Sequence, residues 1–360
     1  MPMEKQTLYF CTLFDSHYLT RGLVMYESLK ACCKDFHLYI FSFDDRSFQL
    51  LKSFNLPHVT VISLSEFEDE DLLRVKPTRS RAEYCWTCTP STILYCLEQF
   101  HLPHCTYIDA DLYFYQDPSI LLEEMGEHSI LITEHRYSPQ YEKSAKAGKY
   151  CVQFITFKQD EYGIKALKWW RERCLEWCYA RLEDGKFGDQ KYLDDWPERF
   201  EKVWVLQHPG GGLAPWNIQQ YEVEQKTCLP DSWICRNYRT GEVFEPVFYH
   251  FHYLRYYTDG RIELGRRKLS KQVLRLIYTP YICKLENMKQ NLIKTYTYLN
   301  LPDRQAGGRE LDFDPNGSSP APNSIKHKLV NLYRKIKGVY HVYPVQKFLA
   351  ACRLADLEKC

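Results

Sequence analysis

The chain has 360 residues with 45% hydrophobic content, enough to bury the core of one large domain or of one domain with an appendage. No run of about 18 or more apolar residues occurs, so the sequence predicts no transmembrane helix. Residues 1–7 lack the charged and then apolar layout of a signal peptide, and we therefore expect a cytoplasmic protein.

Charge and cysteine content also bear on the domain organisation and on the expected disulfides. Residues 261–360 hold 19 Lys and Arg against 8 Asp and Glu, whereas residues 1–260 hold 28 against 38. This asymmetry predicts an organisational boundary near residue 260. The 15 cysteines are odd in number and scattered, so we interpret most of them as small buried hydrophobes and not as a disulfide framework.

The first part of the chain alternates between strand and helix patterns. Apolar runs predict strands at residues 8–14, 38–43 and 59–64, and apolar residues at helical spacing predict helices at 18–33 and 47–54. This alternation is typical of an α/β fold with a mostly parallel, twisted sheet and helices on both faces.

The middle of the chain continues this alternation around a central apolar strand. We interpret Pro90 as the start of a helix that ends near Phe100, and the strand that follows leads into Asp109 and Asp111. Residues 135–149 have no clear period and are interpreted as a loop near the site. Further strands are predicted at residues 129–133, 150–157, 203–207 and 245–253, helices at 119–125 and 160–183, and a loop at 208–217.

The last part of the chain is predicted to be helical at residues 269–298 and 325–357, with a stretch rich in Gly, Pro and Ser between them. The expected organisation is a catalytic domain at residues 1–265, a helical extension at 266–301, a linker at 302–324 and a basic helical C-terminal segment at 325–360.

Asp109 and Asp111 are the strongest candidates for a functional site. If the strand ends here, both carboxylates can be aimed at one cation outside its carboxyl end, where ligands collect in open α/β sheets. Hard oxygen ligands suit Mg²⁺ or Mn²⁺, and an ion held by two carboxylates keeps positions free for substrate phosphates. The alternative is a solvated strand end that happens to carry two acids.

Between residues 8 and 254 the chain resembles the retaining, metal-dependent nucleotide-sugar glycosyltransferases of family 8, which have the GT-A fold. In that family the first strand is followed by an Asp and a Tyr that hold the nucleobase, and a Tyr-hydrophobic-Asp-x-Asp motif comes later. An Asp-Gln pair lies near the donor sugar, and a late His is the third metal ligand. The matching residues are Asp15 and Tyr18, Tyr107 to Asp111, Asp189-Gln190, and His250.

The resemblance implies a role for each matching residue and for several neighbours. The implied roles are nucleotide binding for Asp15, Tyr18, Arg81, Asp109 and Ala110; metal binding for Asp109, Asp111 and His250; catalysis for Asp189 and Gln190; and contact with the sugar or acceptor for Gln153, His208, Trp216 and Asn217.

Two departures from the family pattern concern this site. Trp86 stands where the family has the Arg of a Tyr-x-Arg motif, so the arginine at the diphosphate would be Arg79 or Arg81, or is absent. Gln153 stands in place of the Asn of the family's Asn-x-Gly strand, and it would take over the contact with the sugar.

Two histidines compete for the third metal position. The family's H-x-x-G-x-x-K-P-W motif is matched only in part from His208 to Trp216, where Ala214 replaces Lys. His250 lies in Tyr-His-Phe-His-Tyr, with Tyr253 where the family has Gly. We favour His250, because its distance after the Asp-Gln pair is closer to that of the family.

Sugar transfer requires stabilisation of the departing diphosphate, which a Lewis-acid metal provides, and of the positive charge on the anomeric carbon. Asp189 and Gln190 are suited by type to the second task. We therefore expect a hexosyltransferase that moves a sugar from a UDP-linked donor, with Mn²⁺ or Mg²⁺, to a glycan or lipid-linked acceptor in polysaccharide biosynthesis. The alternatives are a haloacid-dehalogenase-like phosphatase that uses Asp109 and Asp111, and a catalytically silent nucleotide-sugar-binding protein.

The basic C-terminal part predicts peripheral contact with an anionic membrane, on its inner face. Nine Lys and Arg lie among apolar residues from residue 261 to residue 294, and residues 326–337 repeat the mixture. Basic amphipathic helices with aromatic residues lie naturally in the membrane interface. The alternative is a helical cap with a solvated basic face. Nucleic acid is not expected as a partner, because no recognition module is evident.

Overall fold

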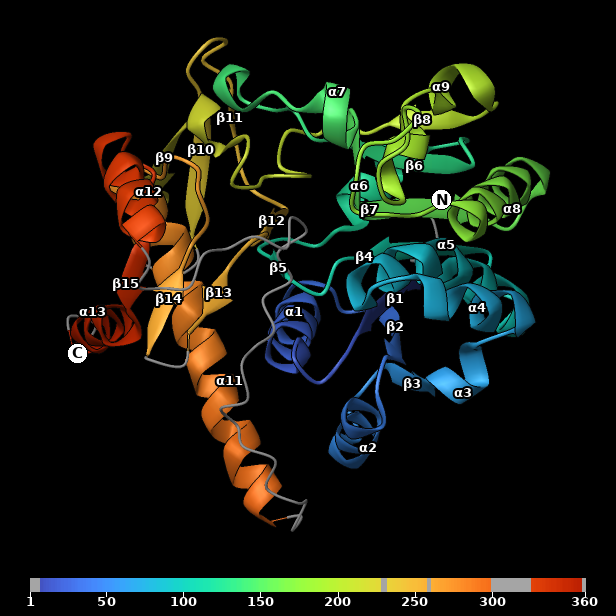
Figure 1. Ribbon diagram of the computed structural model, residues 1–360, viewed down its shortest axis with the longest axis horizontal. Coiled ribbons are helices and arrows are strands. Elements are labelled where there is room, and N and C mark those ends of the chain that lie inside the picture. Colours follow the sequence, from blue (N-terminus) through green and yellow to red (C-terminus); the bar gives the residue numbers. More distant parts are fainter. Residues whose placement is uncertain (1–6, 228–231, 258–259, 299–324, 358–360) are drawn as a thin grey trace, which may run out of the picture. The chain divides into compact units, whose positions relative to one another are not determined.

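The computed structural model describes residues 7–227, 232–257, 260–298 and 325–357 (Figure 1). The chain divides into two compact units, one made of residues 1–212 and 247–249 and the other of residues 213–246 and 250–360. No helix within the described ranges is both long and apolar enough to cross a membrane.

The first unit is built on a seven-stranded sheet in the order β3-β2-β1-β4-β7-β6-β8. Its strands pair in parallel, except that β7 runs antiparallel to both of its neighbours. The predicted α/β fold with a mostly parallel sheet is confirmed. The strands are β1 (Leu8–Phe14), β2 (Phe36–Ser42), β3 (Val59–Ser63), β4 (His104–Ile108), β6 (Ile130–Glu134), β7 (Tyr150–Lys158) and β8 (Val203–Val205), with β5 (Leu112–Phe114) and β12 (Phe248–His250) as a separate pair.

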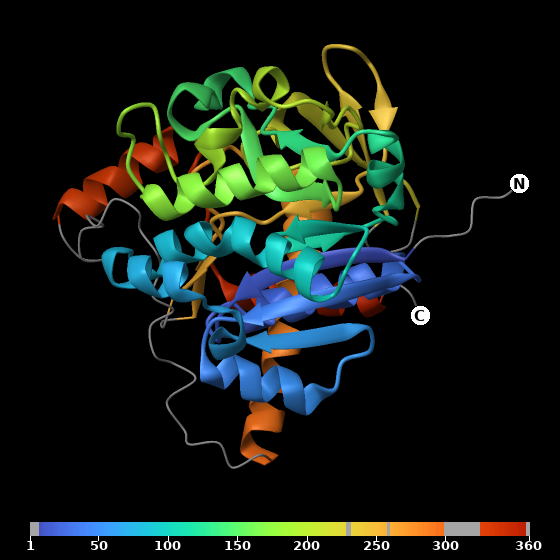
Figure 2. The same cartoon turned by 90° about the vertical axis from the view of Figure 1, so that its right-hand side faces the viewer.

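Helices cover this sheet because its strands are apolar on both faces. On one face α5 and α8 lie side by side (Figure 2), and their core includes Ile93, Leu167 and Trp170. On the other face α1 approaches the sheet closely at Gly22, where a Cβ atom would lie 2.4 Å from the Phe14 ring. The helices are α1 (Leu19–Cys32), α2 (Asp45–Phe54), α3 (Leu64–Phe67), α4 (Glu70–Val75), α5 (Arg81–Gln99), α6 (Ser119–Met125), α7 (Ser144–Ala147), α8 (Glu161–Glu176) and α9 (Trp196–Arg199).

Two predicted helix boundaries in this unit are wrong. α5 begins at Arg81 and contains Pro90 in its interior, because Ser80 and Glu83 form a capping box that starts the helix nine residues earlier. α8 ends at Glu176 and not near residue 183, and Trp177 is already extended. The region 135–149, interpreted as a loop, contains the short helix α7.

The second unit contains two small antiparallel sheets and a set of helices. Its strands were not predicted, because each spans only two to five residues. The elements are β9 (Tyr221–Gln225), β10 (Trp233–Asn237), β11 (Val243–Phe244), β13 (Arg255–Tyr256), β14 (Arg261–Glu263), α10 (Lys271–Val273), α11 (Thr279–Tyr298), α12 (Ile325–Ile336), β15 (Val342–Pro344) and α13 (Val345–Leu357).

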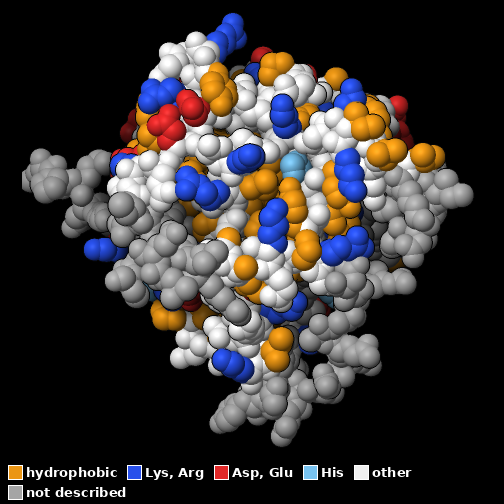
Figure 3. All heavy atoms as spheres, turned by 90° about the vertical axis from the view of Figure 1, so that its left-hand side faces the viewer, with side chains coloured by type: hydrophobic (Ala, Val, Ile, Leu, Met, Phe, Trp, Pro, Cys, Tyr) orange, Lys and Arg blue, Asp and Glu red, His pale blue; other side chains and the backbone are white. Residues whose placement is uncertain are grey.

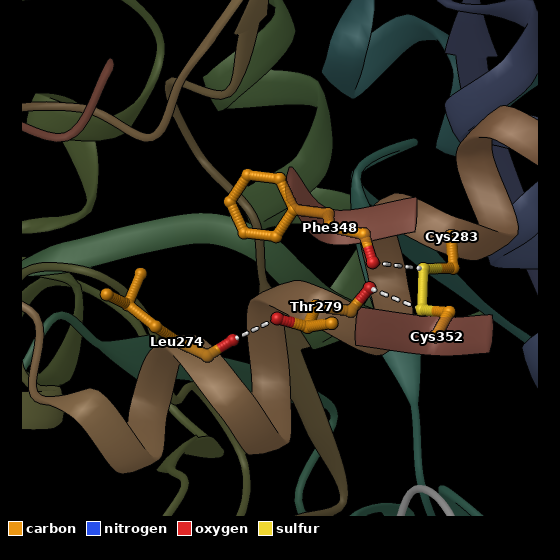
Figure 4. The surroundings of a disulfide bond; sticks show 5 residues. All are labelled: Leu274, Thr279, Cys283, Phe348 and Cys352. Carbon is orange, nitrogen blue, oxygen red and sulfur yellow. Dashed lines mark hydrogen bonds between the residues drawn. A yellow bond between two sulfur atoms is a disulfide. The ribbon is translucent and has the colours of Figure 1, made fainter. Parts of the chain in front are cut away.

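A disulfide joins α11 to α13 through Cys283 and Cys352 (Figure 4). It was not predicted, although the free cysteines follow the prediction: nine of the eleven in the described part of the chain are buried. The helical prediction for residues 269–298 is largely confirmed by α10 and α11. The predicted linker at 302–324 lies outside the described residues, and the domain boundary at residue 265 stays a prediction.

Candidate active site

Three adjacent parallel strands of the first unit are each followed by an aspartate. β2, β1 and β4 are neighbours in the sheet, and the chain beyond them carries Asp44, Asp15 and Asp109 respectively. Because parallel strands have their carboxyl ends at one edge, these acids share the edge where open α/β sheets bind ligands.

Arg81 links the first two of these acids. Its Nε lies 2.5 Å from Oδ2 of Asp15, and its Nη2 lies 3.3 Å from Oδ2 of Asp44. Asp44 also accepts hydrogen bonds from the backbone N–H groups of Ser47 and Ser16. Burial alone would raise the pKa of Asp44, but these hydrogen bonds outweigh it and lower the pKa. The Asp44 carboxylate therefore stays charged, and together with Asp15 it holds the guanidinium at the sheet edge.

Tyr18 begins the turn into α1 beside Asp15. The Asp15 side chain accepts from the backbone N–H groups of His17 and Tyr18, which fixes this turn. The Tyr18 ring is 43% exposed, and the guanidinium of the buried Arg21 lies 4.5 Å from its centroid. An exposed ring held in this position has a flat face on which another planar ring can stack.

Asp109 and Asp111 lie in the tight connection between β4 and β5. The N–H of Asp109 donates to the carbonyl of Gln153 on β7, and the Tyr107 hydroxyl donates to Oδ1 of Asp109 at 3.2 Å. Burial, and then the charges of Asp109 and Asp189, raise the pKa of Tyr107, so its hydroxyl remains a donor. Asp111 is buried, at 8% exposure.

Asp189 is a buried acid close enough to Asp109 for the two charges to interact. Burial, and then the charge of Asp109, raise its pKa to about 7, against lowering by hydrogen bonds that include one from Thr89. Its backbone is fixed on both sides. The Trp170 indole donates to the Asp189 carbonyl at 2.9 Å, and Gly188, at a φ of 55°, lies against Trp86.

His250 is the last residue of β12, the strand that pairs with β5 directly after Asp111. Val247, just before β12, accepts from Tyr115 and donates to Gly210. Asp109, Asp111 and His250 offer ligand atoms that all lie within 4.8 Å of one another. Two carboxylates and an imidazole form a mixed oxygen and nitrogen set that suits Mn²⁺ or another divalent ion.

His208 takes a different position. Within the described residues it does not belong to a group of at least three metal-ligand side chains. Its N–H donates to Glu124, and its Nδ1 accepts from the N–H of Gly210. Arg136, two residues after the end of β6, donates to the carbonyls of Leu206, His208 and Gly211. These hydrogen bonds hold the loop that carries His208 close to the end of β6.

The remaining predicted residues have structural contacts of their own. Gln190 donates to the carbonyl of Ala147 at 2.6 Å, which ties α7 to the segment after Asp189. Asn217 accepts from the N–H of Ala214 within its own turn. Trp216 is buried and lies edge-on to the rings of His250 and His252. Catalysis by Gln190 and contact of Trp216 and Asn217 with the sugar or acceptor therefore stay predictions.

Sequence comparison identifies relatives of this chain. No protein-family model matches it. It is 30% identical over 290 residues to the uncharacterized protein YfnD of Bacillus subtilis, covering 78% of this chain and 89% of YfnD. It is 34% identical over 225 residues to the uncharacterized protein YfnF of the same organism, covering 60% of this chain and 74% of YfnF. The chain belongs to the family of YfnD and YfnF.

Several solved structures that resemble this member of the YfnD and YfnF family are glycosyltransferases. Mouse xyloside xylosyltransferase 1 matches 69% of this chain and 98% of its own, with 12% identity and a TM-score of 0.44. The galactosyltransferase LgtC, in complex with donor and acceptor sugar analogs, matches 68% of this chain and 87% of its own, with 11% identity and a TM-score of 0.44. The fold class rests on the sheet order itself.

Several residues at the sheet edge were missed by the sequence analysis. Asp44 could have been found, because an acid directly after the second strand of an alternating α/β pattern falls at the same edge as Asp15. Thr89 and Arg136 could not, because they reach the site from the middle of a long helix and from a loop without periodic pattern. Their contacts with Asp189 and with the loop at residues 206–212 are long-range in sequence.

Proposed function

We propose that this protein is a metal-dependent glycosyltransferase with a GT-A arrangement of its sheet. It transfers a sugar from a UDP-linked donor to a glycan or lipid-linked acceptor, with retention of configuration. The observation that carries the proposal is the pair Asp109 and Asp111, grouped with His250 and placed beside the buried Asp189 at the carboxyl edge of a parallel sheet.

The nucleotide is assigned to the edge of β1 and β2. The exposed Tyr18 ring is suited to stack on a base, and Asp15 can accept hydrogen bonds from base or ribose. Arg81 is half exposed between two carboxylates, so one of its faces is available to a diphosphate oxygen. Ala110 lies between the two acids of the motif, where its backbone is close to the same nucleotide.

The divalent ion is assigned to Asp109, Asp111 and His250, whose donor atoms fit Mn²⁺ or Mg²⁺ by type and by mutual distance. When bound, the ion would act as a Lewis acid that stabilises the negative charge on the departing diphosphate. The protein supplies the orientation: the Tyr107 hydroxyl and the backbone of β7 fix Asp109, and burial keeps Asp111 from turning into solvent.

The sugar is assigned to the region of Asp189 and Gln190. A carboxylate there would stabilise positive charge on the anomeric carbon, and the positive charge of the ion would favour the ionised form of Asp189. Gln153 is fully buried, its backbone carbonyl accepts from the N–H of Asp109, and its side-chain amide lies beside Gly212; we assign it to positioning of the donor sugar. His208, Trp216 and Asn217 are assigned to sugar or acceptor contact.

A donor screen tests this function. The full chain is incubated with Mn²⁺ and a panel of UDP- and GDP-sugars, and free UDP or GDP is measured. We expect Mn²⁺-dependent hydrolysis of a UDP-sugar, and Asp111→Asn should lower it by about 100-fold or more, because a Lewis acid contributes several kcal/mol. Asp109→Asn should act likewise. Asp45→Asn, an exposed acid on α2, is the matched control and should keep full activity.

Variants of the two histidines distinguish a ligand of the metal from a residue that contacts the sugar or acceptor. His250→Ala should raise the Mn²⁺ concentration needed for half-maximal hydrolysis, whereas His208→Ala should alter sugar or acceptor use at an unchanged requirement. Full activity of Asp111→Asn in chelating buffer would contradict the metal assignment. Hydrolysis of phosphomonoesters without hydrolysis of any nucleotide sugar would instead establish a phosphatase.

A further inference from the structure

The helix α12 has an apolar stripe that faces solvent. Leu329, Leu332, Tyr333 and Ile336 follow one another at the spacing that places side chains on one face of a helix. All four are between 55% and 75% exposed. In a helix that packs on its own protein, this stripe would face the core.

A polar anchor holds the opposite side of α12 to the protein. Arg334 is buried, and its guanidinium lies 2.5 Å from Glu263 on β14, which is also buried. The same guanidinium donates to the carbonyl of Gly265, and the Arg334 carbonyl accepts from the N–H of Val339. The helix is therefore fixed with a charged residue inward and its apolar residues outward, so the exposure of the stripe is built into the packing.

Basic side chains accompany this stripe, and acidic ones are scarce. From residue 325 to residue 357 the sequence has seven Lys and Arg but a single acid, Asp356. Lys337 lies 5.8 Å from the ring centroid of Tyr333, and Lys335 lies 5.0 Å from that of Tyr340. Figure 3 views the side on which Figure 1 draws α12 and α13, and Lys and Arg are interspersed there with hydrophobic side chains.

We propose that this face, defined by Leu329, Leu332, Tyr333, Ile336 and their basic neighbours, docks on an anionic lipid bilayer. The bilayer surface combines negative headgroups with apolar chains below them, and both features match the face. Lysine stems and tyrosine rings are amphipathic and suit this boundary.

Charge argues against a second copy of the chain as the occupant. A twofold contact through α12 would bring the same basic residues of both copies together, and like charges across an interface are repulsive. A bilayer with anionic lipid reverses the sign of this interaction. The other basic stretch, at residues 261–294, does not offer such a face, because Leu269, Val273, Leu276 and Ile277 are buried.

Vesicle binding of the full chain tests the proposal. Sedimentation with phosphatidylcholine vesicles is compared with and without phosphatidylglycerol, at low and high salt and without any nucleotide sugar. We expect binding only with phosphatidylglycerol and a loss of binding at high salt, because the headgroup attraction is screened within a Debye length. Each lysine near the surface should contribute about fivefold to the partition coefficient.

Two double variants separate charge from apolar contact. Lys335→Glu with Lys337→Glu should lower partitioning by more than about 25-fold, and Leu332→Ser with Ile336→Ser should abolish it at every salt concentration. The matched controls lie on the first unit. They are Leu73→Ser, a leucine 50% exposed on α4, and Lys165→Glu on α8, and both should bind like the wild type.

Failure of the full chain to sediment with phosphatidylglycerol vesicles at low salt overturns the proposal, as does unchanged binding of both double variants. A concentration-dependent dimer that Leu332→Ser with Ile336→Ser dissociates, without vesicle binding, would assign the face to a second copy. The proposal does not rest on the proposed glycosyl transfer. Soluble donor hydrolysis by the α12 variants should equal that of the wild type, so the two proposals fail independently.

Discussion

At the scale of single residues, Asp189 shows how far burial and a neighbouring charge can raise the pKa of a carboxyl group. Its side chain is buried and close to the charge of Asp109, and its pKa rises from 3.8 to about 7. The sequence indicated this residue only through the Asp-Gln pair of the resemblance. Sequence spacing could not reveal its pKa, because burial and the neighbouring charge come from chain segments distant in sequence.

The raised pKa predicts a pH dependence of stability in the metal-free protein. The folded state holds the proton of Asp189 more tightly than the unfolded state, so this group stabilises the fold below about pH 4, and its contribution is lost as the pH rises towards 7. A rise from 3.8 to about 7 corresponds to at most roughly 4 kcal/mol. Denaturant unfolding in chelator across this range measures it.

Asp189→Asn is the diagnostic variant for this prediction. The amide cannot ionise, so the unfolding free energy of the variant should fall less between pH 4 and pH 7 than that of the wild type. Added Mn²⁺ should also flatten the wild-type profile, because a nearby cation favours the charged carboxylate. Parallel pH profiles of wild type and variant in chelator would contradict the assignment of a raised pKa to this residue.

At the scale of elements, Gly212 combines two constraints within the loop at residues 206–212. Gly212 has a φ of 106°, and a Cβ atom there would lie 2.9 Å from Cγ2 of Thr133 and 3.2 Å from Nε2 of Gln153. The sequence analysis included this glycine only as part of the partial motif from His208 to Trp216. Of the three successive glycines only Gly212 has a positive φ, and its close neighbours come from β6 and β7, which the sequence alone does not place.

Gly212→Ala should therefore be costly, and Gly185→Ala is its matched control. Gly185 also has a positive φ, of 73°, but nothing lies within 4 Å of a Cβ atom built there. Both variants should lose about 1–2 kcal/mol of unfolding free energy from backbone strain. Gly212→Ala should lose about 1–3 kcal/mol more from the clash, together with donor hydrolysis. Equal unfolding free energies of the two variants would contradict this account.

Element existence was predictable where apolar periodicity is strong, and boundaries were not. The first three strands and the helices between them follow from alternation alone, and β1 has the predicted bounds. The start of α5 was misplaced because Pro90 was given more weight than the capping box of Ser80 and Glu83. A proline within a long, well-packed helix is tolerated more readily than its propensity suggests.

At the scale of the whole molecule, the sequence indicated a basic C-terminal part but not how the chain divides. The second unit begins at Leu213, returns briefly to the first unit at residues 247–249 and then continues. Composition cannot reveal such an excursion, because three residues carry no compositional signal. The group Asp109, Asp111 and His250 depends on it, since β12 brings the histidine to the strand that follows the acids.

The disulfide between Cys283 and Cys352 predicts that the stability of the molecule depends on redox conditions. It links positions 69 residues apart in sequence, and closing a loop of this length in the unfolded chain removes entropy worth at most about 4 kcal/mol. Cys352→Ser should lower the unfolding free energy accordingly under oxidising conditions. Dithiothreitol should lower that of the wild type to the same level and leave the variant unchanged.

Cys32→Ser is the control for this pair, because Cys32 is a half-buried cysteine outside this disulfide, and its thiol donates to the carbonyl of Phe114. Its unfolding free energy should respond to dithiothreitol as the wild type does. Cys283→Ser should match Cys352→Ser, and the double variant should add little, since either substitution alone opens the loop. A contrary outcome is that dithiothreitol leaves the unfolding free energy of the wild type unchanged while both cysteines resist alkylation. That result would mean that burial, and not a covalent bond, holds α13 on α11. If both are alkylated in the native protein without reductant, they are thiols, and no disulfide contributes to the unfolding free energy.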